Sequence, residues 1–283
     1  MKQREHILKA LPDVPGLPTA AVRVLGIMDD PDAGIADIMA AVEIDPRLTT
    51  NVLKLANSAY FAGPRSIGNL TQAGVLLGSK RIQQLVVAAA IFPVAGKQIR
   101  GYDLAPGILL EHLLAVALGT EHLAKALKYK LPGYGFTAAL LHDIGKIVLG
   151  TFLEIDAAPI VQLAFTEGKS FQDAEYEVLG IDHAETGALL LESWQIPAPI
   201  VEVARWHHDP EQAVVDPMLV KLVHVADHVS FECGVGVGVD GLNYRPSERV
   251  VKELHLTTTM LEEVACQMMV ALETLRPQLL GED

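Results

Sequence analysis

The segment ALLHDIGKIVLG, residues 139–150, places a histidine and an aspartate side by side at the end of an apolar run. Gly145 and Lys146 follow His142 and Asp143, and the chain then becomes apolar again. An imidazole and a carboxylate at such a position are either metal ligands or a polar pair that is buried for structural reasons. Helical spacing of the apolar residues predicts one helix across this region, over residues 136–153.

The composition of the chain favours helices that pack through aliphatic side chains. Of its 283 residues, 50% are hydrophobic, and this apolar content is enough for one large core or two smaller ones. Only 5% of the residues are aromatic. Helical spacing recurs in almost every segment and strand-like alternation is scarce, so we predict an all-α fold. We expect an N-terminal helical part over residues 1–100, a helical bundle over 101–232, and a Gly-rich loop with C-terminal helices over 233–283.

The charge of the chain disfavours some classes of partner. Its formal net charge is −13, whereas a nucleic-acid-binding protein needs a basic surface, so we expect no nucleic-acid partner. Cys233 and Cys266 match no disulfide or zinc spacing, which indicates a reducing compartment. The N-terminus lacks the apolar segment of a signal peptide, and the apolar run over 85–95 is shorter than the roughly 20 residues that span a membrane. We therefore expect a cytoplasmic protein without a membrane partner.

Several other histidines and carboxylates also lie on or at the ends of apolar helices. Helices that point such side chains inward can build a metal site in a bundle core, although a single histidine on an apolar face is more often a hydrogen-bonded core residue. Imidazole and carboxylate ligands suit one or two divalent ions, which we expect to be Fe, Mn, Ni or Zn. The residues in question are His112, His142, Asp143, His183, His207, His208 and Asp227.

Two residues of the opening segment are candidates for catalysis. Asp143 carries a carboxylate that can bridge two ions, and a bound ion can lower the pKa of a water toward ~7. Lys146 lies one helical turn beyond His142, where its ammonium can contact a phosphate oxygen. His122, His224, His228 and His255 lack such a context, so we predict surface or packing roles for them.

The order of four of these residues resembles the HD superfamily of metal-dependent phosphohydrolases. The resemblance implies that His112, His142, Asp143 and Asp227 ligate metal. His183 and the pair His207–His208 are similar to the additional ligands of the HD-GYP cyclic-di-GMP phosphodiesterases, which share HDIGK and its lysine.

A closer resemblance is to the HDOD family, the HD-related output domain of bacterial signalling proteins. It is carried by DPRLTTNVLKLANSAYF (45–61), IGNLTQAGVLLG (67–78), HAETGALLLESWQIP (183–197) and ARWHHDP (204–210). The resemblance implies an HD-like helical bundle with an N-terminal helical subdomain.

The chain also departs from the HD-GYP pattern. DPEQAVVDP follows His208 where those enzymes have a Gly-Tyr-Pro stretch, and Ile108 stands where they often have a glutamate. Glu111 lies on the wrong face of its helix to replace that glutamate. One or two ions are therefore expected, so that a binuclear site is possible, and a third ion is not expected.

These features favour a signal-transduction output module that retains its metal site and acts through protein or ligand binding, with a signalling protein as partner. The alternative is a metal-dependent phosphohydrolase that acts on a nucleotide or cyclic dinucleotide, with Lys146 steadying the phosphate. A third interpretation is a metal that only stabilises the fold. The sequence leaves open whether the chain is an enzyme, and it leaves open the metal, the ligand, the pathway and the oligomeric state.

Two further segments are given structural interpretations. In LANSAY we predict that Asn57 and Ser58 cap a helix end and that Gly63–Pro64 form the turn that follows. GVGVG, residues 234–238, has no strand before it and no helix directly after it, which argues against a dinucleotide-binding loop.

Overall fold

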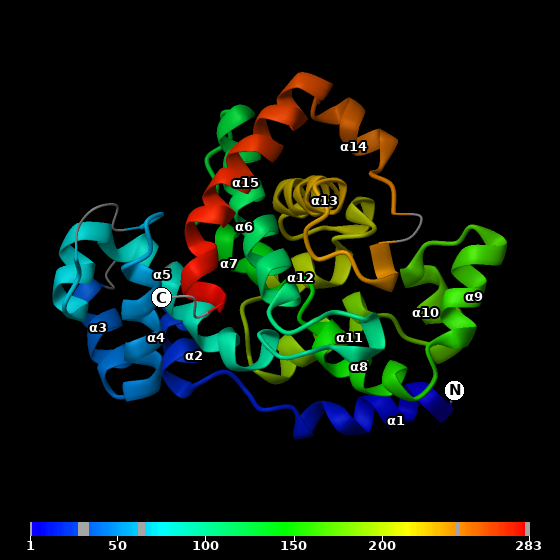
Figure 1. Ribbon diagram of the computed structural model, residues 1–283, viewed down its shortest axis with the longest axis horizontal. Helices are drawn as coiled ribbons and strands as arrows, with labels where there is room; N and C mark the ends of the chain where they lie inside the picture. Colours follow the sequence, from blue (N-terminus) through cyan, green and yellow to red (C-terminus); the bar gives the residue numbers. More distant parts are fainter. Residues whose placement is uncertain (1, 28–33, 62–65, 242–243, 281–283) are drawn as a thin grey trace.

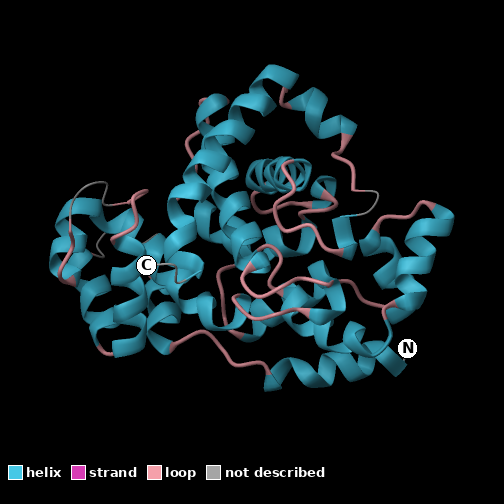
Figure 2. Ribbon diagram, in the orientation of Figure 1, coloured by secondary structure: helices cyan, strands magenta, loops and turns pink. Residues whose placement is uncertain are grey.

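The structure is a computed structural model that describes residues 2–27, 34–61, 66–241 and 244–280 (Figure 1). Helices make up its regular structure (Figure 2). The described residues form no β-strand, and a single isolated bridge pairs Ile99 with Leu104. The predicted all-α fold is confirmed.

Four helices form an N-terminal block on one side of the molecule (Figure 1). They are α2 (Thr19–Gly26), α3 (Ile35–Glu43), α4 (Pro46–Ala56) and α5 (Leu70–Ala95). Asp45, a common N-cap residue that stands before Pro46, caps α4, because its side chain accepts hydrogen bonds from two backbone N–H groups at the start of that helix. The apolar faces of α2, α3 and α4 pack against α5.

Asn57 fastens the end of α4 to the segment that leads into α5. Its side-chain amide donates to the carbonyl oxygen of Leu53 at 2.9 Å and to that of Ile67 at 2.8 Å, and its side-chain oxygen accepts from the Ile67 N–H at 2.7 Å. This confirms the predicted capping role of Asn57. The same role predicted for Ser58 is wrong, because its buried hydroxyl has no hydrogen-bond partner among the described residues. The predicted turn at Gly63–Pro64 lies outside the described residues.

The long helix α5 bends at Gly78, where the backbone leaves helical geometry with φ 77° and ψ 167°. The apolar spacing of residues 70–95 predicts a break near Gly78 and a helix end at Phe92–Pro93. The break is confirmed, but the helix continues through Pro93 to Ala95. By length and composition α5 is the one helix in the described ranges that could span a membrane, and more than half of its most apolar window is buried within the protein. Such burial is typical of a core helix.

The second block is a bundle of helices around α6 (Ile108–Ala126). The other main helices are α7 (Gly135–Leu141), α8 (Gly145–Asp156), α11 (His183–Ser193), α12 (Ala198–Trp206), α13 (Pro217–Glu232) and α15 (Thr258–Leu280). Shorter helices lie around them: α9 (Ala158–Glu167), α10 (Phe171–Leu179) and α14 (Glu248–Glu253). α15 packs along α6 and also contacts α4, so it connects the two blocks.

The helix predicted over 136–153 is two helices. α7 ends at Leu141 and α8 begins at Gly145, so His142, Asp143 and Ile144 lie between them. The apolar pattern conceals this break because α7 is buried along its whole length and the first turns of α8, residues 145–150, are buried except for the half-buried Ile147.

The first helix, α1 (Lys2–Ala10), packs against the bundle and lies away from the N-terminal block (Figure 1). Arg4 pairs with Glu185 at 2.5 Å and donates a hydrogen bond to the carbonyl oxygen of Gly180 at 2.7 Å. The predicted N-terminal part, residues 1–100, thus includes one helix that rests on the bundle.

Candidate metal centre

The predicted ligand residues converge in the interior of the bundle from five places in the fold. His112 lies within α6, His142 and Asp143 follow α7, His183 opens α11, His207 and His208 follow α12, and Asp227 lies within α13. All seven belong to one of two groups whose ligand atoms lie within 4.8 Å of one another. The sequence prediction that these side chains come together therefore agrees with the structure.

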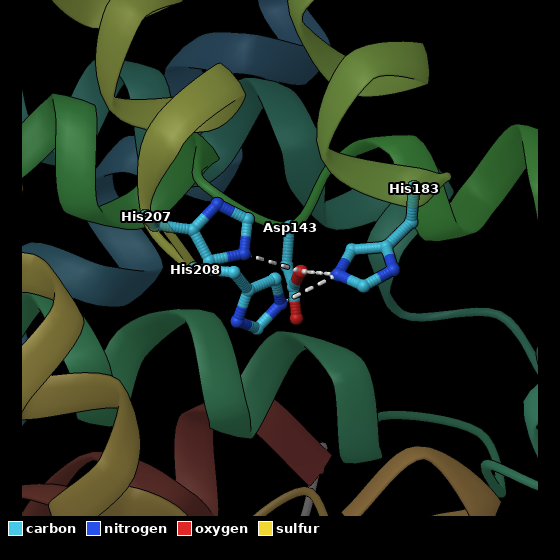
Figure 3. Close-up of side chains that lie close together, drawn as sticks. All are labelled: Asp143, His183, His207 and His208. Atoms are coloured by element: carbon cyan, nitrogen blue, oxygen red, sulfur yellow. Dashed lines mark hydrogen bonds and ion pairs between the residues drawn. The ribbon is translucent and has the colours of Figure 1, made fainter. Parts of the chain in front are cut away.

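The first group consists of Asp143, His183, His207 and His208 (Figure 3). Oδ1 of Asp143 is 3.4 Å from Nε2 of His183 and 3.5 Å from Nε2 of His207. Nε2 of His208 lies 2.8 Å from Nε2 of His183. Three imidazoles thus face one carboxylate oxygen.

The second group consists of His112, His142 and Asp227. Oδ1 of Asp227 is 3.1 Å from Nε2 of His112 and 3.6 Å from Nε2 of His142. The other oxygen of Asp143, Oδ2, is 3.4 Å and 3.6 Å from the same two nitrogens. Asp143 therefore lies between the groups and presents one oxygen to each.

Backbone carbonyls fix the ring orientation of two of the histidines. Nδ1 of His142 is 2.7 Å from the carbonyl oxygen of Ala139, and Nδ1 of His207 is 2.9 Å from that of Ala204. Because a carbonyl oxygen only accepts hydrogen bonds, the proton of each neutral ring lies on Nδ1 and the lone pair of Nε2 points into the centre. This is the arrangement of metal-binding histidines in proteins.

Side chains do the same for His183 and His112. Nδ1 of His183 is 2.6 Å from Glu175, which also accepts from the His183 backbone N–H at 2.9 Å. Nδ1 of His112 is 3.2 Å from the hydroxyl of Ser230. Sequence reasoning missed Glu175 and Ser230, since neither stands in a motif with its histidine.

Several atoms of the centre are buried without a hydrogen-bond partner in the described part of the chain. They are Nε2 of His112, His142 and His207, Oδ1 of Asp143, and both carboxylate oxygens of Asp227. A buried polar atom without a partner costs about 1–3 kcal/mol, so several together need an explanation. Divalent metal ions would satisfy all of them, and the nitrogen and oxygen donor set suits Zn, Fe, Mn or Ni. The residues therefore fit a metal centre.

The charges of the ligands support this fit. Burial alone would raise the pKa of the Asp143 and Asp227 carboxyls. Lys146 and the neighbouring histidines nevertheless hold the pKa of Asp143 well below its usual range, and the neighbouring histidines do the same for the pKa of Asp227. Burial alone would lower the pKa of His112, yet the two aspartates raise it to about 9. The metal-free centre thus holds ionised carboxylates that attract cations, either protons on the histidines or metal ions.

Lys146 lies inside the centre, where its side chain is 2% exposed. Its ammonium contacts Asp143 and lies 2.5 Å from Oδ2 of Asp240. Burial alone would lower the pKa of Lys146, but Asp143 and Asp240 outweigh it and hold the pKa above its ordinary value. The lysine is therefore a cation enclosed by two carboxylates.

Asp240 comes from the Gly-rich segment 233–245, which the sequence linked to no site. The described part of it, residues 233–241, passes directly over the centre, because a Cβ atom at Gly236 would lie 2.4 Å from Cβ of His112. Gly236 also has a φ of 74°, which favours glycine. A glycine at position 236 reflects this close approach, but the spacing of the glycines does not indicate which side chain lies beneath them.

Two close contacts hold the ligands in register. A Cβ atom at Gly145 would lie 2.0 Å from the carbonyl oxygen of His183, so only glycine lets α8 approach α11 this closely. His224, predicted as a surface or packing residue, is buried and donates from Nδ1 to the carbonyl oxygen of His207 at 2.7 Å. Its Nε2 accepts from the Ser247 N–H at 2.8 Å, so His224 is neutral and supports the His207 backbone.

A pocket of about 360 Å³ opens beside the first group. Its wall includes Lys146, His183, His208, Asp240, Tyr244 and Arg245. The volume lies at the small end of the range for sites that bind small ligands.

Comparisons with known proteins agree with this architecture. The chain is 24% identical to an HDOD domain protein with unknown function from Geobacter sulfurreducens, with a TM-score of 0.74 over 95% of this chain and 88% of that one. It is 25% identical to a proposed phosphohydrolase from Shewanella amazonensis SB2B, with a TM-score of 0.62 over 93% of this chain and 97% of that one. A proposed signal transduction protein from Marinobacter aquaeolei VT8 is 18% identical, with a TM-score of 0.73 over 98% of this chain and 65% of that one, which shows a shared fold.

The sequence is also similar to a known protein and matches a family model. An uncharacterized protein of Treponema pallidum (strain Nichols) is 27% identical over 214 residues, which is 74% of this chain and 40% of that protein. The chain thus spans about two fifths of the length of this relative. The model of the HDOD domain matches residues 14–210, more than two thirds of the chain. The chain therefore belongs to the HDOD family.

Proposed function

We propose that this HDOD chain is a signal-transduction module that binds one or two divalent metal ions and acts by binding a protein partner or a small ligand in the cytoplasm. The observation that carries the proposal is the set of buried histidine nitrogens and carboxylate oxygens that face one another without hydrogen-bond partners among the described residues. His183, His207 and His208 would hold one ion, and His112, His142 and Asp227 the other, with Asp143 between them.

A regulatory role is favoured over hydrolysis by the state of Lys146. A lysine that steadies a phosphate needs an ammonium open to the ligand, but this one is enclosed by Asp143 and Asp240. Most of the proposed ligands are also 0–2% exposed. Bound metal would supply concentrated positive charge that attracts an anionic ligand, and it would stabilise the folded state by mass action.

The second candidate function is a metal-dependent phosphohydrolase, which the pocket beside the centre favours. His183 and His208 line this pocket together with Arg245, whose guanidinium suits a phosphate. The pocket volume of about 360 Å³ favours a ligand of mononucleotide size over a cyclic dinucleotide. In this function Arg245 would orient the phosphate and the histidines would hold the metal that polarises it.

A substrate screen on metal-loaded protein separates the two functions. The wild-type chain and Asp143→Ala are assayed with mononucleotides and cyclic dinucleotides, and ligand binding is followed by calorimetry. The regulatory proposal predicts metal-dependent binding without turnover. Turnover that disappears in Asp143→Ala would replace it with the hydrolase, and neither binding nor turnover in a metal-loaded wild type would leave a protein partner as the ligand to seek.

A further inference from the structure

We infer that Asp240 is a positioning residue of the metal centre, because it holds the Lys146 ammonium and so leaves Asp143 available to a cation. The inference rests on the proposed metal-binding function and deepens it. Asp240 stands in the Gly-rich segment, outside the predicted ligand set and outside the two ligand groups.

The side chain of Lys146 is almost completely buried, although it forms part of the wall of the pocket. The side chain is 2% exposed and that of Asp240 is 3% exposed. The ring centres of Tyr102 and Phe231 lie 5.8 Å and 5.5 Å from Nζ. Because a buried charge without a partner is strongly unfavourable, the ammonium must remain against a carboxylate.

Lys146 and a metal ion compete for one oxygen atom. Oδ2 of Asp143 contacts the ammonium, and the same atom lies 3.4 Å from Nε2 of His112 and 3.6 Å from Nε2 of His142. A divalent ion bound between these nitrogens would face the positive charge of the lysine at short range. Like charges in a buried site repel strongly, so the lysine would weaken metal binding unless another group held it.

Asp240 supplies that group. Its Oδ2 is 2.5 Å from Nζ of Lys146, so the ammonium keeps a charged partner when a cation takes Asp143. Asp240 also balances the charge of the lysine. The carboxylate of Asp240 therefore pairs with the lysine, which leaves the ligands of the two groups free to bind the metal.

The backbone of the Gly-rich segment fixes Asp240 in place. A Cβ atom at Gly238 would lie 2.2 Å from the carbonyl oxygen of Tyr102, and one at Gly236 would enter the ring of His112. These close approaches seat the segment on the bundle two and four residues before Asp240. The close packing of this segment on the bundle thus places the Asp240 carboxylate against Lys146.

The test is a titration of the metal-free chain with Zn²⁺ in competition with a chromophoric chelator. Asp240→Asn should bind Zn²⁺ at least roughly 10-fold more weakly than wild type, the loss seen when groups that support metal ligands are removed. The double variant Lys146→Met/Asp240→Asn should return to within about threefold of wild type, because the competing ammonium is gone. Asp209→Asn is the matched control, since Asp209 lines the same pocket but is exposed and makes no described contact with Lys146.

Three outcomes would overturn the inference. Asp240→Asn with wild-type Zn²⁺ affinity shows that Asp240 does not position the lysine. A loss that persists in the double variant shows a structural role for the segment, and an equal loss in Asp209→Asn shows a general effect of charge. If the wild-type chain binds no Zn²⁺, the proposed function itself fails, which is a different result from any of these three.

Discussion

Replacing Gly145 with alanine tests the geometry on which the metal centre depends. The new Cβ atom would lie 2.0 Å from the carbonyl oxygen of His183 and 2.5 Å from the backbone nitrogen of Gly187. Both contacts are with backbone atoms, so no side-chain rotation relieves them and α8 must move away from α11. Overpacking of this kind costs about 1–3 kcal/mol, and a backbone clash belongs at the upper end. At 2–4 °C per kcal/mol, we expect Tm to fall by about 6–12 °C.

The same displacement should damage the centre. Asp143 precedes Gly145 by two residues and His183 carries the clashing carbonyl, so the 3.4 Å separation of their ligand atoms would increase. We expect Gly145→Ala to bind Zn²⁺ at least roughly 10-fold more weakly, measured by chelator competition alongside thermal melts. Gly26→Ala is the control, because a Cβ atom there meets nothing within 4 Å. A Gly145→Ala protein with unchanged Tm and unchanged Zn²⁺ affinity would show that the ligand geometry does not depend on the close approach of α8 and α11.

Three further predictions concern the centre. Glu175→Gln removes the charge that orients His183 at 2.6 Å, so Zn²⁺ affinity by competition titration should fall by roughly 10-fold to 100-fold, and an unchanged affinity would contradict the orienting role. Removing metal with a chelator should lower Tm by about 5–10 °C, because ligand at 100 times Kd adds about 2.7 kcal/mol of stability; equal melts with and without chelator would argue against a bound metal. Finally, the pKa values of His112 and His183, raised to about 9, mean that their stabilisation is complete below the unfolded pKa of about 6.5 and is lost as pH rises through about 9. Melts of the metal-free protein should therefore show Tm falling across that window, and the fall should be smaller with metal, which replaces those protons; a metal-free Tm that is flat or rises there would contradict the assignment.

The sequence predicts the local features of this fold well, because their causes are local. Asp45, Ser170 and Asp182 are residue types that favour helix caps, and each side chain accepts from a backbone N–H two or three residues ahead. The face of α15 that carries Val264 and Met268 is buried as its spacing predicts. The break between α7 and α8 escaped prediction, because two buried helices in succession have one continuous apolar pattern.

Contacts between distant segments are harder to predict. The ligand residues were identified because their order matches a known pattern, yet nothing in that pattern refers to Asp240 or Glu175. Asp240 meets Lys146 only because glycines let the segment 233–241 pass over α6. Nothing in the sequence of α1 specifies that Arg4 will pair with Glu185 in α11. Such pairings depend on how whole helices pack, which single-residue spacing does not record.

Metal content tests most directly whether the buried histidines and carboxylates form a metal centre. The wild-type chain and Asp143→Ala, both purified without a histidine tag or chelator, are compared by elemental analysis after their folds are checked by circular dichroism. A metal centre at this position predicts one or two equivalents of Fe, Mn, Ni or Zn in the wild type and their loss from a folded Asp143→Ala protein. A folded wild-type chain that contains no metal, and takes up none when Zn²⁺ or Mn²⁺ is supplied, would contradict it and make His142 and Asp143 a polar pair buried for structural reasons.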